Sequence, residues 1–144
     1  MKRNIKGQSL FEVVVALAMA AMIIVSVVVL ATLSMQSSAF SKNKTLATRY
    51  GQDAIEWLRG QRDNTTTFWD NVEVGNRCLV ELVWTNLGNC DETEVITNTQ
   101  FQRQVSFTSI VDSGVEAKVI VSWTDAKGYH ESQTNTIFSD WRNK

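Results

Sequence analysis

The fold of this chain is decided near its start, where residues 6–12 read KGQSLFE and an apolar run from Val13 to Leu33 comes next. About twenty consecutive apolar residues are enough to cross a bilayer as a helix. A short basic leader that contains Lys2, Arg3 and Lys6 precedes the run. This excess of positive charge predicts a single membrane span with its N-terminus on the cytoplasmic side.

Glu12 is the unexpected residue of this stretch, because it lies at the edge of the apolar run. Placing a carboxylate inside a membrane helix costs about 2.5–3.5 kcal/mol on insertion scales. A carboxylate at this position is therefore a candidate functional group.

The order of these features resembles the class III signal of type IV prepilins and of type II secretion pseudopilins: Lys-Gly, then Gln-Ser-Leu-Phe-Glu, then an unbroken apolar helix. The resemblance implies that a membrane aspartyl peptidase, the prepilin peptidase, cuts after Gly7 and usually methylates the new amino terminus at Gln8. It also implies that Glu12 pairs with the amino-terminal charge of a neighbouring subunit. Two features depart from the family pattern. Gln8 stands where Phe or Met is usual, and Val29 takes the place of the mid-helix proline of many major pilins.

Two other interpretations of the apolar run stay open. An ordinary secretory signal could be cut at Ala18-Met19-Ala20, but Glu12 would then lie inside its apolar core, and the run continues well past that site. A plain single-pass anchor would need neither cleavage nor assembly. It would display a non-assembling binding module with an adhesin-like head.

The length and charge of the chain limit the region beyond the apolar run. Of its 144 residues, about 110 remain after the leader and the membrane segment, enough for one small domain with a modest core. The formal net charge is −1, so the chain has no global basic field that would attract nucleic acid. Nucleic acid is therefore not an expected partner.

From Ser34 to about Arg62 the sequence becomes polar but keeps a helical period. No proline separates this segment from the apolar run, and the lone Gly51 costs only about 1 kcal/mol in a helix. We predict one continuous helix from Ser9 to Arg62, ended by Gly60 and the cluster of residues 63–65. Its buried stripe is predicted to contain Phe40, Ala47, Tyr50, Ala54, Trp57 and Leu58.

The end of this helix carries a second resemblance. Residues 51–63, GQDAIEWLRGQRD, with Trp69 a little further on, are similar to a stretch of minor pilins called pilus modification proteins. A local explanation also accounts for these residues, since Arg59, Arg62 and Asp63 can satisfy terminal carbonyls and one another.

Cys78 and Cys90 lie beyond the apolar run, on the side that the charge bias assigns to the exterior. Residues 78–85 are β-prone and residues 86–89 have turn chemistry. Because disulfides persist outside the cytoplasm, we predict a bridge between the two cysteines. A zinc site is not expected, since His130 is the only histidine and tetrahedral sites need four ligands.

Three clearer strands are predicted at residues 101–111, 115–124 and 129–138, in which apolar and polar residues alternate. Residues 112–114 and 125–128 supply turns, and an antiparallel meander of three or four strands over the amphipathic helix is expected. The predicted fold is α+β, a long N-terminal transmembrane and amphipathic helix packed on a small antiparallel β-sheet head, which is the pilin ladle. The predicted boundaries are 1–7 for the leader, 8–33 for the membrane half, 34–62 for the amphipathic half and 63–144 for the head.

A search for catalytic motifs finds no nucleophile elbow, phosphate-binding glycine loop or zinc-protease signature. We therefore expect no enzymatic activity and no cofactor, and we interpret His130 as a surface residue. The acidic residues Asp91, Glu92 and Glu94 could bind calcium, but their spacing favours solvated loop charge. Core or sheet-covering roles are expected for Trp69, Trp84, Trp123 and Trp141.

The sequence thus predicts a structural subunit, a minor pilin or pseudopilin, of a type IV pilus-like or type II secretion-like filament. The resemblance implies as partners the prepilin peptidase, other pilin subunits, membrane lipid and, indirectly, a platform protein and an assembly ATPase. It places the chain in the cytoplasmic (inner) membrane first and in an extracellular filament afterwards.

Overall fold

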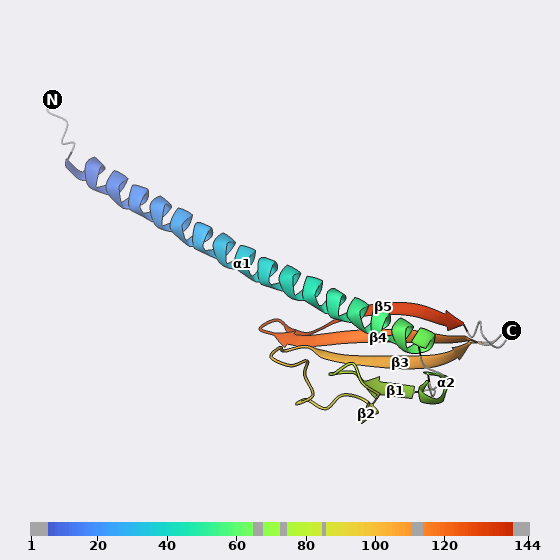
Figure 1. The fold of residues 1–144 in the computed structure, drawn as a ribbon. Helices are drawn as coiled ribbons and strands as arrows, with labels where there is room; N and C mark the ends of the chain where they lie inside the picture. The colour runs from blue at the N-terminus through green and yellow to red at the C-terminus, as the bar shows by residue number, and fades with distance from the viewer. Residues whose placement is uncertain (1–5, 65–67, 73–74, 85, 111–113, 140–144) are drawn as a thin grey trace. The chain divides into compact units, whose positions relative to one another are not determined.

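The computed structural model describes residues 6–64, 68–72, 75–84, 86–110 and 114–139 (Figure 1). Two compact units divide the chain, Met1–Lys42 and Asn43–Lys144. The elements are, in chain order, α1 (Lys6–Asn64), α2 (Phe68–Asn71), β1 (Gly75–Cys78), β2 (Asn86–Leu87), β3 (Gln102–Ile110), β4 (Gly114–Asp125) and β5 (Gly128–Ser139).

The first unit consists of the N-terminal part of α1. Within the described residues, α1 is the helix that is long and apolar enough to cross a membrane, and its most apolar segment contains no buried residue. The hydroxyls of Ser26 and Thr32 donate to the backbone oxygens of Met22 and Val28, at 2.8 and 2.9 Å. These two polar side chains are therefore satisfied by their own helix.

The predicted continuous helix is confirmed, with ends at Lys6 and Asn64 rather than Ser9 and Arg62. Gly60 does not stop it, contrary to expectation, because a single glycine costs a helix only about 1 kcal/mol. Phe40 is also not part of the buried stripe. It is 38% exposed and belongs to the first unit, whereas the compact second unit begins only at Asn43.

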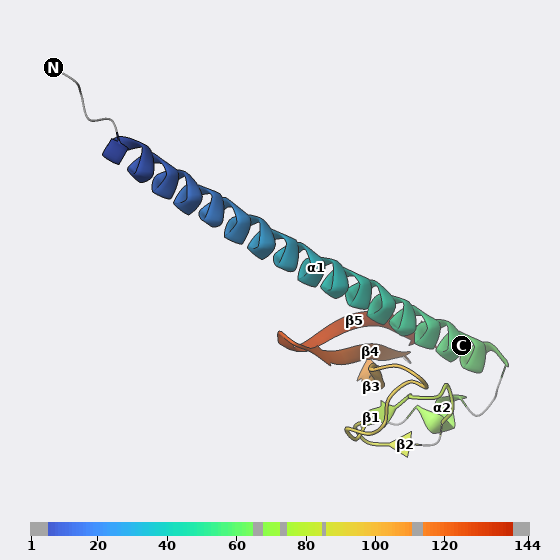
Figure 2. The ribbon, with the colours of Figure 1, turned by 90° about the vertical axis from the view of Figure 1, so that its left-hand side faces the viewer.

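In the second unit the described strands form one antiparallel sheet in the order β2-β1-β3-β4-β5. The predicted meander is β3–β4–β5, and the later part of α1 covers one face of it (Figure 2). The turn expected at residues 125–128 joins β4 to β5, and Gly128 has the positive φ of 115° that favours glycine there. In the other expected turn, residues 112–113 lie outside the described part of the chain.

The core lies between α1 and this face of the sheet. Every second residue of β4 is buried, as the alternation predicts: Val115, Ala117, Val119, Val121 and Trp123. The helix contributes Ala47, Ala54 and Leu58, all fully buried. Trp69 and Trp84 pack against the core as expected, and Trp141 lies outside the described residues.

The strand predicted at residues 78–85 is wrong. β1 ends at Cys78, residues 79–84 form no strand, and the expected turn residues Asn86 and Leu87 form β2 instead. The backbone oxygens of Leu79 and Val80 accept hydrogen bonds from the side chain of Arg103. Local β propensity was overridden by this contact from a distant strand.

Gly51 has a packing role that sequence analysis did not detect. A Cβ atom at this position would lie 2.9 Å from Oγ1 of Thr134 on β5, so only glycine lets α1 approach the sheet this closely. A Cβ atom at Gly60, in the same helix, would meet nothing within 4 Å. The two glycines are therefore a matched pair for testing the contact between helix and sheet.

We expect Gly51→Ala to lower the free energy of unfolding by about 1 kcal/mol, because overpacking outweighs the better helix propensity of alanine. Gly60→Ala gains the propensity without the clash and should raise it by about 0.5–1 kcal/mol. Urea unfolding of the detergent-solubilised chain, followed by tryptophan fluorescence, measures both. Equal stabilisation by the two changes would show that the close approach at Gly51 does not affect the free energy of unfolding.

Candidate functional site

The motif residues Gly7 and Gln8 lie in the first turn of α1, and Glu12 is in the next turn. The first backbone N–H groups of a helix have no partner within it, so its first turn opens at the lowest cost. The bond between Gly7 and Gln8 is therefore in the part of α1 that becomes extended at the lowest cost.

Glu12 is exposed among exposed apolar side chains, with Leu10 73% and Phe11 71% exposed. Among the described residues it has no hydrogen-bond or ion-pair partner. Whatever compensates its charge in an apolar environment must therefore come from outside the described part of the chain.

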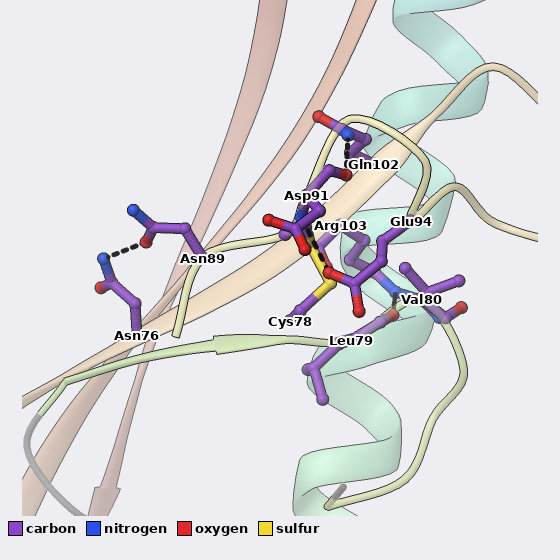
Figure 3. Close-up of a disulfide and its surroundings, with 10 residues drawn as sticks. Asn76, Cys78, Leu79, Val80, Asn89, Asp91, Glu94, Gln102 and Arg103 are labelled. Atoms are coloured by element: carbon purple, nitrogen blue, oxygen red, sulfur yellow. Dashed lines mark hydrogen bonds between the residues drawn. A yellow bond between two sulfur atoms is a disulfide. The ribbon is translucent and has the colours of Figure 1, made fainter. Parts of the chain in front are cut away.

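The disulfide between Cys78 and Cys90 is confirmed, with a Cα–Cα distance of 4.8 Å and a sequence separation of 12 (Figure 3). Two hydrogen bonds hold the residues before Cys90 against β1. The Asn76 side chain donates to Oδ1 of Asn89 at 2.7 Å, and the Gly88 N–H donates to the Asn76 oxygen at 2.8 Å. The bridge therefore fixes one end of the loop at residues 91–100.

Arg103 is a central residue of the core that sequence reasoning missed. Its guanidinium is buried and donates to three backbone oxygens, those of Leu79 at 2.8 Å, Tyr50 at 3.2 Å and Val80 at 3.3 Å. Burial lowers the pKa of Arg103, and the nearby Asp53 opposes this shift. The sequence could have predicted this burial. Arg103 occupies one of the alternating positions 101, 103, 105 and 107, and the other three are the apolar residues Phe101, Val105 and Phe107.

The acidic residues after Cys90 have a structural role in their loop. An oxygen of Glu94 accepts the Asp91 N–H at 2.8 Å, and the Gln102 side chain donates to the Asp91 backbone oxygen at 2.7 Å (Figure 3). Among the described residues, three side chains of metal-binding type converge only at Cys78, Cys90 and Glu94, where the two sulfurs are bonded to each other. Asp91 and Glu94 thus take part in the hydrogen bonds that shape their loop.

His130 differs from the expected surface residue. It is half-buried, and its Nε2 lies 2.9 Å from Oδ1 of Asp125 across the β4–β5 hairpin. The same carboxylate accepts the Lys127 N–H at 2.8 Å, and these two hydrogen bonds lower the pKa of Asp125. His130 and Asp125 together close the hairpin turn.

Comparison of the chain with protein-family models, with characterised proteins and with solved structures finds no match. Its function is therefore inferred from the motif, the exposed helix and the head described above.

Proposed function

We propose that this chain is a structural subunit of a type IV pilus-like or type II secretion-like filament, assembled from the membrane after prepilin peptidase has cut after Gly7. The observation that carries the proposal is Glu12, a carboxylate without a partner among the described residues, on an apolar helix whose side chains are exposed. A helix of this kind requires an apolar surrounding for its side chains and a positively charged partner for Glu12.

The apolar surface of α1 is stable only where it is shielded from water. Burying one large apolar side chain contributes about 1.5–3 kcal/mol, and more than a dozen such side chains are exposed between Leu10 and Met35. Before assembly these side chains contact membrane lipid, and in the filament they pack against the apolar helices of other subunits.

The charge of Glu12 needs a positive partner. After cleavage Glu12 is the fifth residue of a helix that begins at Gln8, and the helix dipole contributes little there because its effect falls off within the first turn. The dipole therefore offsets only a small part of the roughly 2.5–3.5 kcal/mol that a carboxylate costs in a membrane helix. The new ammonium group at Gln8 of an adjacent subunit supplies the rest, so docking in the correct axial register is favoured.

The second unit is suited to the outside of the cell. A disulfide persists in an oxidising compartment, and the basic leader favours a cytoplasmic N-terminus. The chain would therefore wait in the cytoplasmic membrane with its head outside, and a platform protein and an assembly ATPase would move it into the filament.

Cleavage after Gly7 is the direct test of this proposal. Gly7→Leu should block processing and leave the full-length chain in the membrane, because the peptidase must fit a small side chain before the cut bond. Intact-mass spectrometry of the membrane and surface fractions measures this, and the unaltered surface protein should begin at Gln8.

Gly60→Ala is the control, since it changes a glycine of the same helix that has open space around it. It should be processed at the normal site. A surface protein that begins at Met1 would indicate a non-assembling anchor instead, and one that begins after Ala20 an ordinary secretory signal.

A further inference from the structure

A cavity of about 520 Å³ opens on the face of the sheet that is turned away from α1. A Cβ atom at Gly51 of α1 would lie 3.8 Å from Cγ2 of Val121, so this residue of β4 faces the helix. Its neighbour Ser122 points to the opposite face, because successive strand residues alternate. The lining comes from β3, β4, β5 and the loop before β3, and it includes Glu92, Gln100, Gln102, Ser122, Thr124 and Tyr129.

The strand register brings the polar lining together. Gln102 of β3 lies opposite Ser122 of β4, and Thr124 of β4 lies opposite Tyr129 of β5. Residues directly opposite on neighbouring strands have their side chains on the same face. Segments that are far apart in the sequence thus place hydroxyl, amide and phenol groups side by side.

The loop that walls the cavity is held in place at several points. The disulfide fixes Cys90, the Gln102 side chain donates to the Asp91 oxygen, and the Ile96 N–H donates to the Phe101 oxygen at 2.8 Å. The cavity is therefore preformed, and a ligand would not have to order the wall on binding.

Ser122 is a largely buried polar residue of this lining. It is only 9% exposed, and its hydroxyl makes no hydrogen bond to any described residue. The side chains of Gln100, Thr124 and Tyr129 likewise have no hydrogen-bond partner in the described part of the chain. These hydroxyl, amide and phenol groups are accessible from the cavity, so they are free to exchange bound water for hydrogen bonds to a ligand.

The chemistry of the lining selects the class of ligand. Hydroxyl and amide groups both donate and accept, which matches a ligand with many hydroxyls. Glu92 is the charged residue of the lining, and Asp91 precedes it in the chain. Anionic ligands are therefore repelled.

Tyr129 adds an aromatic surface at the rim, where it is 65% exposed. The negative face of an aromatic ring attracts the weakly positive C–H groups of an apolar ring face. A neutral sugar combines such a face with several hydroxyls, and the cavity volume falls within the usual range for small-molecule sites. An extended peptide would instead be expected to add to a sheet edge.

We propose that this cavity is a carbohydrate-binding site, for one or two neutral sugar residues of a glycan. The site belongs to the second unit alone and does not depend on cleavage at Gly7 or on filament assembly. A failure of sugar binding would leave the proposed structural role untouched, and the reverse also holds.

The test uses the full-length chain in a zwitterionic detergent, since detergents with sugar head groups would compete. Glucose, galactose, mannose, N-acetylglucosamine, lactose and maltose are titrated separately at millimolar concentrations and followed by saturation-transfer NMR. At least one should bind saturably. Tyr129→Ala and Gln100→Ala should each weaken that binding by about tenfold.

Ile137→Ala is the matched control. Ile137 is on the same strand as Tyr129, is also 65% exposed, and points to the same face of the sheet, but it does not line the cavity. This variant should bind the sugar as the unaltered chain does. The proposal is overturned if no sugar binds saturably, if Tyr129→Ala binds as tightly as Ile137→Ala, or if inorganic phosphate binds more tightly than every sugar.

Discussion

Replacing Glu12 by leucine is expected to leave membrane insertion intact and to lower incorporation into filaments by at least about tenfold. Insertion is unaffected or improved because the cost of placing a carboxylate in the membrane helix disappears. Incorporation falls because the ammonium group at Gln8 of the adjacent subunit is left unpaired in an apolar environment. A loss of about 1.4 kcal/mol per docking event is enough for a tenfold effect.

The measurement compares the subunit in isolated membranes with the subunit in sheared filaments by quantitative immunoblotting. Glu12→Gln should assemble poorly too, because glutamine keeps the shape of the side chain and loses its charge. Ser26→Ala is the control, since the Ser26 hydroxyl is satisfied by the Met22 oxygen of its own helix. If Glu12→Leu entered filaments at the normal level, Glu12 would have to be reinterpreted as a peptidase-recognition residue or an interfacial bystander.

The elements that could be predicted from the sequence are those with long, regular patterns. The apolar run and the adjoining amphipathic segment indicated the helix, and the alternation from Val115 to Trp123 indicated the buried face of β4. With only two cysteines the chain offers one pairing. In each of these cases the structure that the local sequence favours is also the one that the tertiary contacts favour.

The segment between Cys78 and Leu87 could not be predicted because its conformation is decided from elsewhere. Its β-branched and aromatic residues favour a strand, yet the side chain of Arg103 occupies the oxygens that a strand would pair. The cavity was inaccessible to sequence analysis for a similar reason. Glu92 and Tyr129 line the same cavity only because the strand register and the course of the loop place them there.

Arg103 is the residue whose replacement should destabilise the second unit most. Arg103→Met keeps most of the volume of the side chain and removes all three hydrogen bonds. The Tyr50 oxygen still has its partner within α1, but the oxygens of Leu79 and Val80 lose a charged donor in a largely buried region. Because hydrogen bonds to charged groups contribute about 1.5–3 kcal/mol each and an unsatisfied buried group costs about 1–3 kcal/mol, we expect a loss of about 2–4 kcal/mol of unfolding free energy.

Urea unfolding of the detergent-solubilised chain, followed by tryptophan fluorescence, measures this loss. Arg59→Met is the matched control, since among the described residues Arg59 forms only an exposed ion pair with Glu56 and such pairs contribute about 0–1 kcal/mol. Arg103→Lys should fall between the two, because lysine keeps the charge but cannot reach three oxygens with a planar fork of donors. A cost for Arg103→Met no larger than that for Arg59→Met would mean that packing alone holds residues 79–80 against α1, and that the buried guanidinium contributes nothing to the position of the loop.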